Sequence, residues 1–145
     1  MEGMSTIVKQ VARLVSGLIF IYGIYIILHG HLTPGGGFAG GAIVAGAFIL
    51  LILAYGSSEA RLKMEIRGSS LTESLAILVV ILLALAAMLI GLRIFFANYL
   101  PRGEAGELVS AGVIPLFNLF IGMEVAAAIL TIFLALIIFK EESSE

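Results

Sequence analysis

Glu124 is the ionisable side chain most able to do chemistry, because it lies inside the long apolar run 115–139. If that run crosses a membrane as a helix, Glu124 lies about 5 Å from its midpoint. A carboxylate at that depth costs at least ~2.5 kcal/mol, so it should face protein or water rather than lipid. Thr131 follows seven residues later on the same helical face. Two interpretations are open: Glu124 carries sodium or a proton, or a partner's basic group neutralises it and the pair holds subunits together.

Arg93 and two histidines are the other ionisable candidates. Arg93 lies near the end of the preceding apolar run, and we expect it to extend to the outer membrane surface, with an ion pair to Glu124 as the alternative. His29 and His31 flank Gly30. No metal site is expected there, since residues two apart do not share a helix face and no third ligand is obvious. Interfacial positions are expected for both, with a proton relay as the alternative.

Nothing in the sequence has the pattern of a nucleophile with its base, a set of redox-centre ligands or a nucleotide-binding loop. The chain has no cysteine, which excludes disulfides and thiolate metal sites. Its net charge of −2 gives no reason to expect nucleic acid. We therefore predict a subunit without a catalytic site or a cofactor of its own.

The elements that position these residues are membrane helices. Of the 145 residues, 61% are hydrophobic and 12% charged, and the mean hydropathy is +1.16. A soluble domain is about half apolar, with about a quarter of its residues charged. A helix needs roughly 20 apolar residues to cross the hydrocarbon, and four segments qualify: 7–28, 35–55, 72–97 and 115–139. The predicted fold is a single all-α integral membrane domain with four transmembrane helices in the cell membrane.

Basic residues predict how the helices are oriented. Six of the eight lie in the N-terminal region, between the second and third helices or at the C-terminus: Lys9, Arg13, Arg61, Lys63, Arg67 and Lys140. Arg93 and Arg102 are on the other side. By the positive-inside rule, both termini are cytoplasmic. Between the second and third helices, residues 57–67 are expected to form a short amphipathic helix, and Ser70 to Glu73 fit a capping box that begins the third.

A glycine-rich stretch joins the first two helices. Thr33 is expected to cap the second helix, with Pro34 in its first turn. Gly37 and Gly41 are four residues apart, a spacing that lets two helix backbones approach closely in lipid. We expect this steric role, with ion coordination by exposed carbonyls as the alternative. Asn118, near the start of the last helix, is expected to act as a cap or to form an interhelical hydrogen bond.

The same stretch resembles a known signature. Residues 30–41 read Gly-His-Leu-Thr-Pro-Gly-Gly-Gly-Phe-Ala-Gly-Gly. This resembles the pattern Gly-His-x-x-Pro-Gly-Gly-Gly-Phe-x-Gly-Gly of the B subunit (MnhB/MrpB family) of Mrp-type multisubunit sodium/proton antiporters. Besides Gly30, the matching positions are His31, Pro34, Gly35, Gly36, Gly37, Phe38, Gly40 and Gly41. The chain length and the four predicted spans match as well.

The resemblance implies a small accessory subunit in the lipid bilayer, assembled with large antiporter-like subunits that carry the proton channels. Homologous modules occur in ion-pumping respiratory complexes, notably hydrogenase-type ones of archaea, where other subunits hold the redox reaction. The family usually shows Phe-Asp-hydrophobic-Gly-Val-Tyr in its last span. Aligned on Ile121 and Gly122, this chain has its acid at Glu124 instead. We therefore favour a module for Na+ and H+ within a redox-driven complex, with a stand-alone antiporter subunit or a purely structural spacer as alternatives.

Overall fold

The computed structural model describes residues 3–56, 59–108 and 110–142, with residues 59–63 and 141–142 described by their backbone alone. It contains four α-helices: α1 (Thr6–Leu28), α2 (Gly36–Tyr55), α3 (Glu59–Leu89) and α4 (Ile114–Glu142). All four are long and apolar enough to cross a membrane, and the described residues contain no strand. The all-α fold with four membrane-spanning helices is therefore confirmed.

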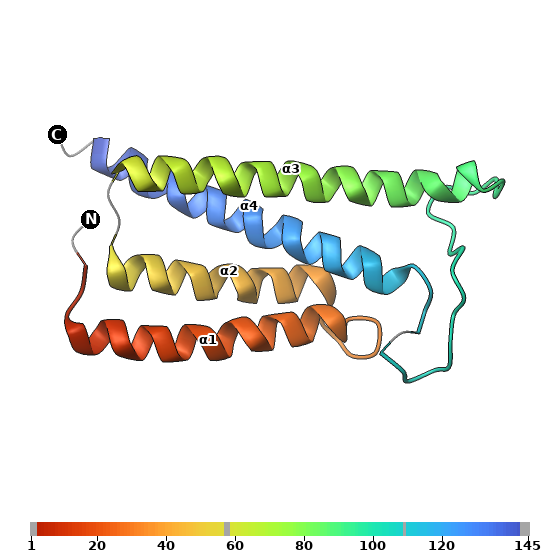
Figure 1. Cartoon of the computed structure of the whole chain (residues 1–145), viewed down its shortest axis with the longest axis horizontal. Coiled ribbons are helices and arrows are strands. Elements are labelled where there is room, and N and C mark those ends of the chain that lie inside the picture. Colours follow the sequence, from red (N-terminus) through yellow and green to blue (C-terminus); the bar gives the residue numbers. More distant parts are fainter. Residues whose placement is uncertain (1–2, 57–58, 109, 143–145) are drawn as a thin grey trace.

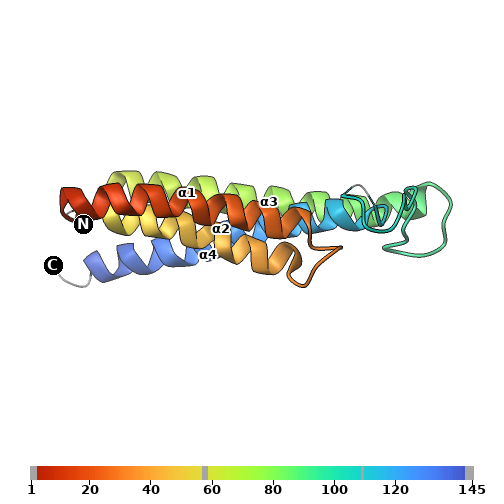
Figure 2. The same cartoon turned by 90° about the horizontal axis from the view of Figure 1, so that it is seen from below.

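The helices form an open row rather than a closed bundle (Figure 1). Their spatial order is α1, α2, α4, α3. α2 packs against α1 and α4, and α1 also touches α4. Among the described residues α3 packs against α4 alone. Seen along the helix axes, both termini lie at one end of the molecule. The 29–35 turn and the long connection between α3 and α4 lie at the opposite end (Figures 1 and 2). The side of the membrane that each end faces stays a prediction.

The third helix differs from its prediction, because α3 runs unbroken through the proposed capping box. The Ser74 hydroxyl donates to the Ser70 carbonyl at 2.9 Å, and the Thr72 hydroxyl donates to the Gly68 carbonyl at 3.0 Å. Ser70 lies eleven residues after the start of α3 and so cannot cap it, and the capping-box prediction is wrong. Most of the predicted amphipathic helix belongs to α3 itself, while residues 57–58 and the side chains of Arg61 and Lys63 lie outside the description.

The third helix also ends earlier than predicted. Gly91 has a φ of +93°, a conformation that glycine adopts readily and that ends a right-handed helix. The amide of Leu92 then turns back to the Ala87 carbonyl at 3.1 Å. A helix extending to residue 97 is therefore wrong, and Arg93 lies in the connection rather than in the last turn of the helix.

The helices pack through small side chains. Most buried apolar residues are alanines, and Leu134 and Val113 are the large side chains that are fully buried among the described residues. Large apolar side chains instead cover the outer faces, including Leu14, Leu18 and Leu75. Small residues inside and large apolar ones outside are what helix packing in lipid requires, since lipid tails solvate leucine as well as protein does.

Candidate ion-path residues and the glycine-rich turn

Thr33 closes the first helix instead of capping the second. Its amide and its hydroxyl both donate to the His29 carbonyl, at 2.9 Å and 3.2 Å. The chain then reverses through Gly35 and Gly36, whose φ angles are +146° and +85°. α2 begins only at Gly36, so Pro34 precedes the helix. The predictions for Thr33 and Pro34 are wrong, because residues with a Cβ rarely adopt the backbone angles that start α2.

Asn118 from α4 takes the capping role. Its Oδ1 accepts a long hydrogen bond of 3.4 Å from the Gly37 amide, one of the first-turn amides that have no partner within their own helix. The interhelical hydrogen bond predicted for Asn118 is therefore confirmed. Its Nδ2 is buried and has no hydrogen-bond partner among the described residues. The side chain thereby ties the glycine-rich turn to the start of α4.

The glycines of α2 face two different helices. A Cβ built on Gly37 would lie 2.5 Å from the Asn118 carbonyl oxygen, and one on Gly41 would lie 2.5 Å from that of Gly122. On the other side, a Cβ on Gly40 would lie 2.8 Å from the carbonyl oxygen of Gly23 in α1. Backbones this close leave no room for side chains. Gly23 is the glycine of α1 that meets Gly40. The sequence could have indicated this contact, because Ser16, Gly23 and Ile27 lie on one face of the helix.

Phe38 is the large side chain of the motif, and it points away from this packing. It is 69% exposed, whereas its neighbours Gly37, Gly40 and Gly41 are buried. The same turn of helix therefore presents a smooth glycine face to α1 and α4 and an aromatic ring to its surroundings.

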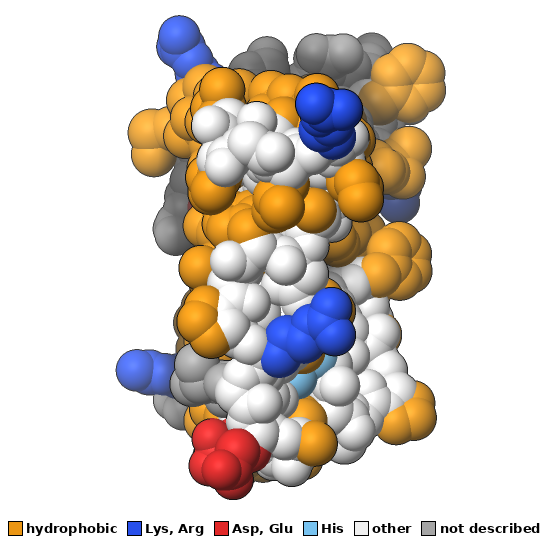
Figure 3. Space-filling model, turned by 90° about the vertical axis from the view of Figure 1, so that its right-hand side faces the viewer, with side chains coloured by type: hydrophobic (Ala, Val, Ile, Leu, Met, Phe, Trp, Pro, Cys, Tyr) orange, Lys and Arg blue, Asp and Glu red, His pale blue; other side chains and the backbone are white. Residues whose placement is uncertain are grey.

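The two histidines lie on the turn and do not share a site. The His29 ring stacks on Tyr25, with ring centroids 4.0 Å apart, and its Nδ1 donates to the Tyr25 carbonyl at 3.0 Å. The His31 Nε2 donates to the Glu107 carbonyl at 3.4 Å, so His31 joins the turn to the long connection. Figure 3 views the molecule from the end that carries the 29–35 turn, where basic, acidic and histidine side chains lie among other polar side chains and backbone, with hydrophobic groups around them.

Asn98 organises the long connection, a role that sequence reasoning missed. Its Oδ1 accepts from the Val113 amide at 2.9 Å, and its Nδ2 donates to the Ala111 carbonyl at 2.9 Å. The amide of Ala111 in turn donates to the Arg102 carbonyl at 2.7 Å. Asn98 thus binds to backbone groups 13 and 15 residues further along the chain. An asparagine in a loop carries no signal of such a distant partner.

Thr131 is part of the contact between α3 and α4. Its hydroxyl lies 2.8 Å from that of Ser69 in α3 and 2.9 Å from the Ala127 carbonyl of its own helix. Ser69 is buried, as are Ala127 and Leu134 on the same stripe of α4. The stripe on which Glu124 and Thr131 lie therefore faces α3.

Glu124 is partly buried near the middle of α4. It lies seven residues from Thr131, about 10 Å along the helix. Because α3 and α4 run antiparallel (Figure 1), this places Glu124 near the level of Ala76, which is 2% exposed. No hydrogen bond or ion pair holds Glu124 among the described residues, and Arg93 is exposed in the connection. The structure does not bring Arg93 and Glu124 together as an ion pair.

No group of three or more His, Asp or Glu side chains in the described ranges lies close enough to hold a metal ion. The structure contains two separate helix contacts. Near the glycine-rich turn, α2 packs closely against α1 and α4. Elsewhere, α3 packs against the stripe of α4 that contains Thr131 and Glu124. This arrangement can hold helices in register, and it places one carboxylate near the middle of α4.

These helices and this turn define a small multi-pass membrane protein built on glycine-mediated packing. Residues 7–131 match the family described as "Domain related to MnhB subunit of Na+/H+ antiporter". The chain belongs to this family and is a multi-pass protein of the cell membrane. The resemblance seen in residues 30–41 is confirmed.

Relatives fall into two kinds by length. A Staphylococcus haemolyticus protein named as antiporter subunit mnhB2 is 34% identical over 144 residues, covering 94% of this chain and 96% of that protein. An uncharacterised protein of Methanocaldococcus jannaschii is 38% identical over 130 residues, covering 86% of this chain. This chain spans about half the length (49%) of that second relative.

A solved structure matches the fold. It is a chain of the membrane-bound sulfane sulfur reductase, an archaeal respiratory membrane complex, with a TM-score of 0.73 and 33% identity. The match covers 89% of this chain and 56% of that one. The sequence is thus similar both to antiporter subunits of its own length and to part of a longer polypeptide of a respiratory complex.

Proposed function

We propose that this chain is a non-catalytic membrane subunit of an Mrp-type cation/proton antiporter module, and that the module belongs to an ion-pumping respiratory complex. The observation that carries the proposal is the likeness to the archaeal respiratory complex, which extends over 89% of this chain at 33% identity. Redox chemistry would then belong to other subunits, and this chain would help to build the membrane part that moves Na+ or H+.

The open row of helices supports assembly with other membrane subunits. α3 packs against α4 alone in the described structure, and large apolar side chains such as Leu75 and Leu89 are exposed along it. Phe38 likewise projects from the glycine-rich motif into its surroundings. Because the described helices stand in a row rather than a closed ring, a translocation path along them would need walls from neighbouring membrane subunits.

Within that assembly, we assign Glu124 to ion translocation. It is a carboxylate at mid-depth, partly buried, on the stripe of α4 that continues to Thr131. A group there is costly unless water, an ion or a partner's polar group reaches it. A proton or Na+ exchanged between such a carboxylate and a neighbouring subunit would meet this requirement.

Replacing Glu124 by glutamine tests this assignment, because the change removes the charge and keeps the shape. In the purified complex reconstituted into vesicles, we expect Glu124→Gln to assemble normally and to lose Na+- or H+-coupled transport. The matched control is Glu104→Gln, which removes an exposed carboxylate from the connection. Unchanged transport in Glu124→Gln would identify the chain as a structural spacer. Loss of assembly would assign Glu124 to subunit contact.

A stand-alone antiporter subunit is the second candidate. It is favoured by the Staphylococcus haemolyticus relative, which matches this chain over 96% of its own length. Isolation of the native complex distinguishes the two. Co-purifying nickel–iron or iron–sulfur subunits would establish the respiratory complex and name its redox enzyme, whether hydrogenase-type or sulfur-reducing. Antiporter subunits without redox partners would establish the second candidate.

A further inference from the structure

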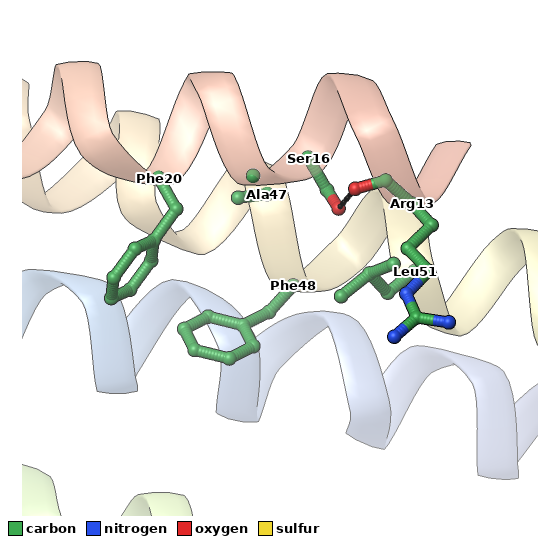
Figure 4. Close-up of a pocket in the computed structure, with 7 residues that line it drawn as sticks. Arg13, Ser16, Phe20, Ala47, Phe48 and Leu51 are labelled. Atoms are coloured by element: carbon green, nitrogen blue, oxygen red, sulfur yellow. Dashed lines mark hydrogen bonds between the residues drawn. The ribbon is translucent and has the colours of Figure 1, made fainter. Parts of the chain in front are cut away.

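A pocket of about 280 Å³ opens between α1 and α2, beside the middle of α1 and the second half of α2, with Arg13 at its side nearer the termini (Figure 4). Arg13, Ser16, Gly17 and Phe20 of α1 line it, together with Phe48 and Leu51 of α2. None of its lining residues belongs to the glycine-rich turn, which begins after α1 ends at Leu28.

The inner part of the pocket is apolar. The rings of Phe20 and Phe48 meet edge to face, with centroids 5.8 Å apart. A Cβ added to Gly17 would meet nothing within 4 Å, so the space beside it is open. The Ser16 hydroxyl is buried and donates to the Arg13 carbonyl at 3.1 Å. It is therefore already paired and does not make the wall polar.

Arg13 supplies positive charge at the outer part of the pocket. It lies seven residues into α1, about 10 Å from the start of the helix. Figure 4 shows its guanidinium beside Leu51, four residues before the end of α2. No carboxylate among the described residues pairs with Arg13. One turn nearer the N-terminus, the Lys9 ammonium lies 5.9 Å from the centre of the Tyr55 ring, so the same end carries a second cation.

The wall of the pocket changes from cationic to apolar with increasing depth in the membrane. From Arg13 through Gly17 to Phe20, α1 passes from a cationic group near its end to an apolar wall nearer mid-membrane. A lipid has the same order, with an anionic phosphate at the surface and an acyl chain beneath it. A guanidinium binds phosphate through two parallel hydrogen bonds, and basic pockets between membrane helices suit anionic headgroups.

We propose that this pocket binds an anionic glycerophospholipid, with its phosphate on Arg13 and one acyl chain beside Gly17 between Phe20 and Phe48. A carboxylate on a partner's helix would also neutralise Arg13. However, a helix is about 10 Å across with its side chains, so it would reach Arg13 with one side chain from outside and leave the apolar space beside Gly17 unfilled, whereas an acyl chain would fill that space.

The test uses the purified complex that contains this subunit, reconstituted into vesicles of mixed phosphatidylglycerol and phosphatidylcholine. One of the two lipids at a time carries a photoreactive diazirine in its acyl chain, and mass spectrometry measures the lipid adduct on residues 13–51. For the wild type we expect about five-fold more adduct from phosphatidylglycerol, the ratio that one basic group near an anionic lipid gives.

Four variants locate the binding. Arg13→Gln should lower the phosphatidylglycerol adduct about five-fold, to the phosphatidylcholine level. Arg67→Gln, which removes an exposed cation eight residues into α3 and outside the pocket, should leave it unchanged. Gly17→Leu should lower the adducts of both lipids, because its side chain fills the path of the acyl chain while Arg13 remains. Should Arg13→Gln fail to assemble, Gly17→Leu together with the charge-preserving Arg13→Lys, which should keep the lipid preference, carries the test.

Three results would overturn the proposal. The first is equal labelling of the wild-type pocket by the two lipids. The second is an unchanged adduct in Gly17→Leu or in an assembled Arg13→Gln complex. The third is absence of a lipid adduct from the wild type while Arg13 cross-links to a carboxylate of a partner subunit, which would make the pocket a protein interface.

Discussion

Replacing Gly41 by alanine tests whether α2 and α4 meet backbone to backbone. A Cβ at this position would lie 2.5 Å from the Gly122 carbonyl oxygen and 3.0 Å from the Cβ of Val125. Ordinary contact begins at 3.4 Å, so the added methyl is 3.4 − 2.5 = 0.9 Å too close to a backbone atom that no rotamer change can move away. The two helices would have to separate by a comparable distance.

The expected loss follows from a comparison within one helix. Gly46→Ala adds the same methyl to α2 at a position where nothing lies within 4 Å. Alanine favours a helix over glycine by up to ~1 kcal/mol, and this gain is common to both variants. Overpacking costs about 1–3 kcal/mol. We therefore expect the free energy of unfolding of Gly41→Ala to be about 1–3 kcal/mol below that of Gly46→Ala.

The assay is reversible unfolding of the assembled complex in mixed micelles of mild detergent and dodecyl sulfate, followed by the fraction of this subunit that remains folded. Both variants are first checked for assembly at the level of the wild type. Equal unfolding midpoints for Gly41→Ala and Gly46→Ala would refute the close approach of α2 and α4, because both variants add a methyl to α2 and the clash arises at Gly41 alone.

Three further predictions concern other parts of the chain. Thr131→Val should destabilise the contact of α3 with α4, and a double-mutant cycle with Ser69→Ala should give a coupling of about 0.6–1.7 kcal/mol for their 2.8 Å hydrogen bond. Asn98→Ala should speed hydrogen exchange of the Val113 amide, which donates to the Asn98 Oδ1 at 2.9 Å. Leaving backbone groups of the connection without this partner should destabilise it by about 1–3 kcal/mol. Because the chain has no cysteine, Thr33→Cys should react with an impermeant thiol reagent in intact cells, and Met64→Cys only after permeabilisation.

Each of these has an outcome that contradicts it. A zero coupling energy would show that the two hydroxyls do not interact in the assembled complex. Unchanged exchange after Asn98→Ala would mean that the connection is held by other groups. Labelling of Met64→Cys but not of Thr33→Cys in intact cells would reverse the orientation predicted from the basic residues.

Hydropathy alone predicted the number and approximate position of the helices, because each apolar run is long enough to cross the hydrocarbon. The boundaries of α3 could not be predicted in the same way. Serine and threonine hydroxyls cap a helix when they bond to free amides, and continue it when they bond to carbonyls of the preceding turn. The Ser74 hydroxyl does the latter, and nothing in the letters from Ser70 to Glu73 distinguishes the two cases.

The candidate site was predictable in its parts and not in its connections. The spacing of Gly37 and Gly41 indicated a close helix contact, but not that Gly40, between them, meets a second helix. Thr33 had the residue type of a cap, yet Asn118, which is 81 residues away from the Gly37 amide it bonds, holds the start of α2. Such partnerships depend on which helices become neighbours, and a linear pattern does not state that.

The neighbours of α3 have a consequence for biogenesis. The ribosome completes α3 before α4, the helix on which it rests in the described structure. Once inserted, α3 therefore has no docking site within the nascent chain until about 25 more residues have emerged and α4 has begun to enter the bilayer. The α1–α2 hairpin faces no such delay, since its two halves are adjacent in the order of synthesis. During this interval α3 is the segment most open to capture by a chaperone or by another subunit of the complex.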